Sequence, residues 1–188
     1  MLRIFPLCFV LFLSLIFSPS GFAKSYSSHL NSVSRDGKIY NFEAWDADLI
    51  WNASFFSDAF RNAQAQKHAK IKYLNPTEKA HWFAEQNKLQ SEYWDFFVSV
   101  YTKKAYKQIS EGKNTFWEFV LLTENGDKIA PLSVEMIPLS PYYKVLYPYI
   151  DRWSMLYLIR FPKVELGKSF SLTSRSVIGK SSLKWKVK

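Results

Sequence analysis

From Tyr93 to the end of the chain, apolar residues recur at alternate positions, which is the period of β-strands. The clearest run covers 93–102, where one face is wholly apolar and the other is mixed. The first face comprises Trp94, Phe96, Val98 and Val100, and the second comprises Asp95, Phe97, Ser99 and Tyr101. A chain with this pattern over about half its length has to build most of its core on β-sheets.

Further short strands follow, separated by turn signals. Phe116–Thr123 alternates in the same way, and Asn125-Gly126 after it is the dipeptide most typical of a tight hairpin. The return strand is expected over 128–137, with Pro131 demoting part of it to an edge or a bulge. Residues 138–149, rich in proline and tyrosine, form a crossover with room for one helical turn. Strands are expected again over 153–161, 170–173 and 183–187.

Two helices are predicted ahead of these strands. Segment 47–72 allows two interpretations: one helix with apolar residues at helical spacing, or a strand over 49–56 followed by a helix from Asp58 with Ser57 as its cap. The stretch 61–69 is helical in both. The second helix starts at Asn75-Pro76, because proline is favoured in a first helical turn. Its expected apolar face comprises Ala80, Phe83, Ala84 and Leu89.

These elements predict an α+β chain that is mostly β, with the helices at about 57–90 and the strands at about 93–188. The favoured architecture is an antiparallel β-sandwich of the immunoglobulin-like type with two N-terminal helices. A single globular domain is expected over 39–188, with a short first strand at 39–45. The serine-rich segment 24–38 has few apolar residues, so we expect it to be a flexible leader.

Residues 1–23 have the three parts of an export signal. Arg3 supplies a positive start, an apolar run covers 4–17, and small residues at Gly21 and Ala23 suit cleavage after Ala23. The run is shorter than the roughly 20 apolar residues of a membrane-spanning helix. The sequence therefore predicts an exported protein, either periplasmic, which we favour, or secreted.

Cleavage at this point removes Cys8, the only cysteine, and leaves about 165 residues, enough for one domain. Disulfides, thiol nucleophiles and thiolate metal sites are then excluded. The loss of Arg3 lowers the formal net charge from +9 to +8, which favours peripheral contact with an anionic surface. An exported protein seldom meets nucleic acid, and six dispersed glycines cannot form a nucleotide-binding loop.

Catalytic and metal-binding patterns are weak in this chain. Glu78, His81 and Glu85 share one side of a helix, but one helix rarely supplies a whole metal site. No serine occupies a glycine-flanked elbow. The fold could bring together two of five carboxylates to form a hydrolase site: Asp46, Asp95, Glu118, Glu135 and Asp151. We predict no cofactor, no metal and no catalytic residue.

The aromatic content is the most informative remaining feature. Some aromatic residues fall on the mixed strand faces or in the crossover, where they are either covered by the helices or exposed as a contact surface. The residues of this predicted contact surface are Tyr142, Tyr143, Tyr147, Tyr149, Phe97, Tyr101 and Phe116. The sequence thus predicts a non-enzymatic binding or structural module that contacts a protein or an envelope component. The alternatives are the carboxylate hydrolase of cell-wall or surface polymers and a carrier of lipids or other apolar ligands.

Overall fold

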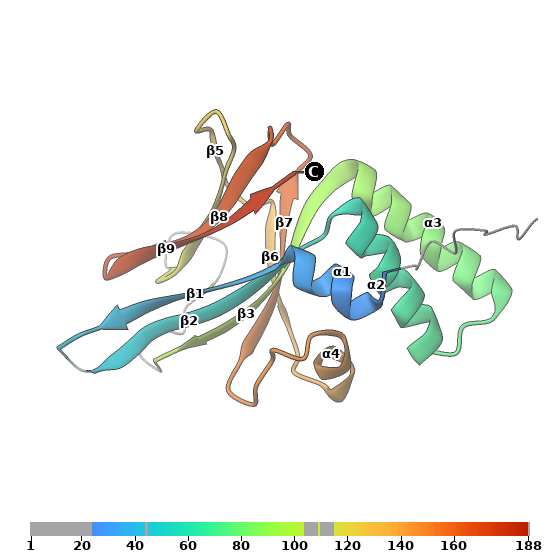
Figure 1. Cartoon of the computed structure of the whole chain (residues 1–188), viewed down its shortest axis with the longest axis horizontal. Coiled ribbons are helices and arrows are strands. Elements are labelled where there is room, and N and C mark those ends of the chain that lie inside the picture. Colours follow the sequence, from blue (N-terminus) through green and yellow to red (C-terminus); the bar gives the residue numbers. More distant parts are fainter. Residues whose placement is uncertain (1–23, 44, 104–108, 110–114, 188) are drawn as a thin grey trace, which may run out of the picture.

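The structure is a computed structural model that describes residues 24–43, 45–103, 109 and 115–187. The predicted export signal at 1–23 lies outside the described residues. Across the described part of the chain, the fold is mostly β, with two antiparallel sheets and four helices (Figure 1). The α+β, mostly β class predicted from the sequence is therefore confirmed.

The larger sheet has five strands in the order β1-β2-β3-β7-β6, and every neighbouring pair is antiparallel. Its strands are β1 (Ser34–Asn41), β2 (Asp46–Phe55), β3 (Tyr93–Thr102), β7 (Met155–Pro162) and β6 (Ser133–Ile137). The smaller sheet has four strands in the order β5-β4-β8-β9, namely β5 (Lys128–Ile129), β4 (Glu118–Leu122), β8 (Ser169–Ser176) and β9 (Gly179–Lys186).

The alternation along β3 assigns its two faces as predicted. Phe96 packs with Phe170 and Trp185 of the smaller sheet, at ring-centroid distances of 6.3 and 5.5 Å. Phe97, the next residue, instead stacks on Tyr147 on the opposite face of the larger sheet. One face of the larger sheet therefore packs against the smaller sheet, and the helices cover part of the other face, where Ile50 of β2 remains 44% exposed.

The Asn125-Gly126 hairpin forms, but its return strand does not continue through 128–137 as predicted. Strand β5 pairs with β4 and ends at Ile129, whereas β6 starts at Ser133 and pairs with β7 of the other sheet. Pro131 lies at the break, because it cannot donate a ladder hydrogen bond. The chain changes sheets there.

The second interpretation of segment 47–72 is confirmed. Strand β2 ends at Phe55, Ser57 accepts a hydrogen bond from the backbone N–H of Phe60, and α2 covers Asp58–Ile71. Helix α3 (Pro76–Glu92) begins with a capping box between Asn75 and Glu78. Its predicted apolar face is wrong in part, because Ala80 and Ala84 are exposed, and Gln86 is the residue that α3 buries.

The segment 24–38 is ordered as secondary structure, which corrects the expectation of a flexible leader. It forms helix α1 (Tyr26–Val33) and the first part of β1, with Ser25 as the helix cap. Two of the few apolar residues, Leu30 and Val33, are buried. Distant residues hold the helix in place: the Tyr26 hydroxyl donates to the Leu146 carbonyl, and the Trp185 indole donates to the Val33 carbonyl.

The outer strands of the two sheets, β1 and β9, lie against each other. The Arg35 side chain donates to the Lys184 carbonyl, and the Trp51 indole donates to the Ser181 hydroxyl. A Cβ atom at Gly37 would lie 2.7 Å from the Ser181 oxygen and 2.9 Å from a Leu183 methyl carbon. This close approach requires glycine at position 37. As a consequence, the β1–β2 connection and the β8–β9 turn lie at the same end of the molecule (Figure 1).

Candidate functional site

The tyrosine-rich crossover folds back onto the larger sheet. Helix α4 (Pro141–Leu146) and the turn after it place Tyr147 on Phe97, with ring centroids 3.8 Å apart and planes within 4°. Tyr143 packs on the same phenylalanine at 5.7 Å. Both Phe97 and Tyr147 are 1% exposed. These two residues therefore cannot belong to the predicted contact surface, because they form the core beneath the helices.

The other members of the predicted contact surface are only half-buried. Tyr142, Tyr143, Tyr149, Tyr101 and Phe116 all retain some exposed area. The structure separates them: Tyr101 is at the end of β3, and Phe116 precedes β4 and packs on Trp117. The Tyr149 hydroxyl shares a hydrogen bond with Ser54, which in turn bonds Ser34, and burial raises the pKa of Tyr149 well above its ordinary value. The seven residues do not form one surface.

A polar cluster joins α2, α3 and α4 beside the crossover. The ring of His68 stacks on Trp82, with centroids 4.1 Å apart, and its Nδ1 shares a hydrogen bond of 2.5 Å with the Tyr142 hydroxyl. Burial, followed by the Lys72 ammonium, lowers the pKa of His68 below its ordinary 6.5. Burial raises the pKa of Tyr142 to about 12. Near neutral pH the cluster therefore consists of a neutral imidazole and a protonated phenol.

We expect this cluster to make stability depend on pH. The folded chain binds a proton at His68 less readily than the unfolded chain, so acidification favours unfolding. The contribution is complete above the unfolded pKa of about 6.5 and is lost as the pH falls through the lower folded pKa. His68→Gln should flatten the profile of urea unfolding midpoints between about pH 5 and 8. The exposed His81 is the control, and an equal flattening by His81→Gln would contradict this assignment.

A buried ionic cluster links α2 to the larger sheet. Asp95 accepts hydrogen bonds from Arg61 at 2.7 Å and from Arg160 at 2.9 Å, one at each carboxylate oxygen. The Arg61 and Asp95 side chains are both 2% exposed. Arg61 also packs on the ring of Phe56, and Arg160 on that of Tyr93. This carboxylate holds a helix on a sheet.

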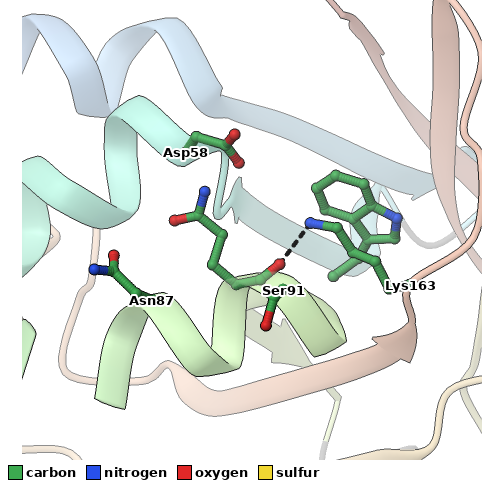
Figure 2. A pocket seen from close by; sticks show the side chains of 6 residues that line it. Asp58, Asn87, Ser91 and Lys163 are labelled. Carbon is green, nitrogen blue, oxygen red and sulfur yellow. Dashed lines mark hydrogen bonds between the residues drawn. The ribbon is translucent and has the colours of Figure 1, made fainter. Parts of the chain in front are cut away.

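Next to this cluster, a pocket of about 450 Å³ lies between α2, α3 and the end of β7 (Figure 2). Its lining residues are Asp58, Asn87, Gln90, Ser91, Trp94 and Lys163. Lys163 donates to the Gln90 carbonyl at 2.6 Å, and its ammonium lies 3.2 Å from the centre of the Trp94 ring. Burial lowers the pKa of Lys163 below its ordinary 10.5, and the Asp58 carboxylate opposes that effect. The lysine thus covers the aromatic face that a ligand would need.

The five carboxylates of the hydrolase alternative lie on different elements. Asp95 is committed to two arginines, Glu118 pairs with Arg175 on the smaller sheet, and Asp46 pairs with Lys103. Asp151 accepts hydrogen bonds from its own turn. Among the residues that the structure describes, no hydrogen bond or ion pair joins any two of the five.

Several exposed apolar side chains lie at the end of the molecule that holds the β1–β2 connection and the β8–β9 turn (Figure 1). Other exposed apolar side chains are dispersed, among them Tyr73 at 92% and Trp153 at 63%. Exposure reaches 76% at Phe42, 81% at Trp45 and 92% at Val177, and Tyr40 and Ile178 are also exposed. We call these five residues the apolar end. The sequence prediction missed it, because residues 39–45 were assigned to a strand. The signal was present in two apolar pairs, Phe42 with Trp45 and Val177-Ile178, placed at turns.

No helix within the described ranges has the length and apolar character needed to span a bilayer. Nor do the residues in those ranges include any cluster of three or more side chains suited to hold a metal ion. Glu78, the first residue of the weak metal pattern, is engaged in the cap of α3. The chain matches no protein-family model, no curated protein and no solved structure.

Proposed function

We propose that this chain is an exported, non-enzymatic binding module, periplasmic in the favoured case, that contacts a protein or an envelope component through the apolar end. The contact surface is thus assigned to different residues from those that the alternation pattern suggested. The observation that carries the proposal is the exposure of Phe42, Trp45 and Val177 in two adjoining turns. Large apolar side chains exposed together are typical of interaction sites in water-soluble proteins.

The backbone at Trp45 is in an unusual conformation for a bulky residue. Its φ is 50°, in the left-handed region that disfavours bulky side chains. A tryptophan there gains nothing from the fold, because its ring is not buried. Asparagine or glycine would be the expected residue at such a turn. Tyr73 has the same backbone region and is 92% exposed, so Trp45 is distinguished by its place beside the exposed Phe42 and not by its backbone.

Two further parts of the proposal depend on the sequence and on the sheet packing. The signal pattern at 1–23 and the lack of cysteine after position 8 support export. The aromatic contacts between the two sheets, such as Trp51 with Phe119 and Phe55 with Phe170, support a sandwich of the immunoglobulin-like type. Neither alternative function gains a specific observation: the carboxylates are dispersed, and stacked rings fill the space between the larger sheet and α4.

A matched pair of substitutions tests the proposal. Trp45 and Tyr73 are both exposed aromatic residues with φ near 50°, at 50° and 52°, and Tyr73 lies in the turn between α2 and α3. Asparagine tolerates this backbone region, so both asparagine variants should fold. We expect Trp45→Asn to lower the fraction of the exported chain recovered with the cell envelope, whereas Tyr73→Asn should not. Equal recovery of the Trp45 variant and the wild type would refute the proposal.

A further inference from the structure

We infer that the outer face of the smaller sheet binds an acidic polysaccharide. This inference goes beyond the proposed function, because it concerns a different surface from the apolar end. Inward side chains of β8 and β9 belong to the core, and Phe170 lies directly opposite Trp185. The alternate side chains of both strands point to the outer face. They are Ser169, Ser171, Thr173, Arg175, Lys180, Ser182, Lys184 and Lys186, and we call these eight residues the cationic face. Thr173 is buried, and the other seven retain exposed area.

The cationic face carries four positive side chains and no carboxylate. Arg175 lies directly opposite Lys180, and Lys184 and Lys186 continue the row along β9. All four are exposed. The sequence contains no Asp or Glu after Glu165. Positive charge of this kind, concentrated on one surface, attracts anions and raises their local concentration.

The carboxylates around the cationic face do not cancel this charge. Glu118 of β4 lies opposite Arg175 and pairs with it. The other charged residues at the border lie in the β4–β5 hairpin and in the β7–β8 connection, namely Glu124, Asp127, Lys128, Glu165 and Lys168. With all of these included, there are six cations and four carboxylates, so the net charge remains positive.

Protection of a sheet edge does not explain the lysines of β9. Lysines on an exposed edge strand discourage pairing with another chain. The edge of β9, however, already lies against β1 (Figure 1). The Arg35 side chain donates to the Lys184 carbonyl there. Within the described ranges, the ammonium groups of Lys180, Lys184 and Lys186 form no ion pair. These three cations are therefore open to an external anion.

The spacing and the chemistry of the cationic face favour a polymer of sugars. Residues on one face of a strand repeat about every 7 Å, so Lys180 and Lys186 are about 20 Å apart. A chain with an anionic group on successive units can meet all three lysines, whereas a small anion meets one. The hydroxyls of Ser169 and Ser171 lie beside these cations and form no hydrogen bond among the described residues. A serine hydroxyl both donates and accepts, which suits the hydroxyl groups of a sugar.

Other classes of partner fit this surface less well. Protein interfaces are centred on aromatic and other large side chains that fill pockets. Single-stranded nucleic acids stack their bases on aromatic rings. A bilayer contact requires apolar side chains that enter the acyl boundary. The cationic face has no aromatic and no large apolar side chain. Its combination of cations and hydroxyls leaves an acidic polysaccharide as the best match.

Isothermal titration calorimetry of the purified exported chain tests the inference with three polymers. Polygalacturonate supplies sugars and carboxylates, polyglutamate supplies carboxylates without sugars, and dextran supplies sugars without charge. We expect polygalacturonate to bind, polyglutamate to bind several-fold more weakly and dextran not to bind. Binding of polygalacturonate should weaken as salt rises from about 0.1 M to about 1 M, where the Debye length falls from about 10 to 3 Å.

Charge-matched variants show where the polymer binds. Lys184→Gln with Lys186→Gln should weaken the binding of polygalacturonate about tenfold at low salt. The control, Lys79→Gln with Lys88→Gln, removes the same charge from exposed positions on α3 and should have little effect. Ser171→Ala should weaken the binding of polygalacturonate and leave that of polyglutamate unchanged.

Three results would overturn the inference: no binding of polygalacturonate, equal binding of polyglutamate, or equal weakening by the two lysine pairs. The first would remove the polysaccharide, the second would show that the sugar is not recognised, and the third would reduce the effect to net charge. Trp45→Asn should bind polygalacturonate as the wild type does. The cationic face and the proposed function of the apolar end can therefore fail separately.

Discussion

Replacement of Asp95 by leucine is expected to lower the free energy of unfolding by about 3–5 kcal/mol. The carboxylate is the anion between Arg61 and Arg160, and Arg61 is almost completely buried. Without Asp95, the guanidinium of Arg61 would be an uncompensated charge in a region of low dielectric constant. Removal of one partner from a buried ion pair is costly for this reason, even where the intact pair contributes little net stability. Urea unfolding followed by circular dichroism measures the loss.

Two controls separate this explanation from a general loss of packing. Addition of Arg61→Met to Asp95→Leu removes the unpaired charge and should restore part of the lost stability. Glu118→Leu breaks an ion pair whose two side chains are about half exposed, and such pairs contribute about 0–1 kcal/mol. If the Glu118 and Asp95 variants lost equal stability, or if the double variant were less stable than Asp95→Leu, the buried charge would not be the cause.

The elements that local sequence signals define were predicted well. Ser57 and Asn75-Pro76 set the starts of α2 and α3, because a capping side chain bonds to backbone within the next turn. Alternation set the bounds of β3 at Tyr93 and Thr102, and Asn125-Gly126 set a hairpin. Each of these signals is contained within a few neighbouring residues. No knowledge of the rest of the chain is needed to interpret them.

The failures share a different cause, since each depends on residues far apart in the sequence. Helix α1 is held by a hydrogen bond from Tyr26 to Leu146, and the pairing of Arg61 with Asp95 crosses 34 positions. The chain changes sheets after Ile129, because β5 pairs with β4 and β6 pairs with β7. Alternation has the same period in both sheets, so it does not reveal which partner strand each segment pairs with. Asp36-Gly37 is a pair typical of turns and indicated one at the end of the leader, but Gly37 lies within β1. Its role appears only when β9 is placed against β1.

The candidate site was missed for a related reason. Alternation assigns a face to each strand residue, but it does not say which faces another element covers. Phe97 fell on the mixed face and was open to both interpretations, and Tyr147 from the crossover decides between them by stacking on its ring. Phe42 and Trp45 continued an apolar pattern past the end of β1 at Asn41, so they were assigned to a strand. The exposure of a side chain depends on the whole fold, and here the exposed aromatic residues include Phe42 and Trp45 of the apolar end.

Replacement of Phe97 by alanine is the second large expected effect, a loss of about 3–5 kcal/mol in the free energy of unfolding. Phe97 is on β3, which is flanked by β2 and β7, and its ring packs on Tyr143 and Tyr147, so its removal leaves a cavity between the sheet and the crossover. These stacked rings hold the crossover against the sheet, together with the hydrogen bonds of Leu146 and Tyr149. Urea unfolding gives the change in stability. Phe97→Leu, which fills more of the space, should lose less.

The matched control for Phe97 is Tyr101, which lies on the same strand and face but is only half-buried, so Tyr101→Ala should cost clearly less. The apolar end belongs to the β1–β2 connection and the β8–β9 turn, neither of which contacts α4 through the stacked rings. Under conditions where Phe97→Ala remains folded, it should therefore be recovered with the cell envelope as the wild type is. A loss of envelope recovery in the folded Phe97 variant would show instead that the covered face takes part in the contact, and the separation between core and contact surface would be wrong.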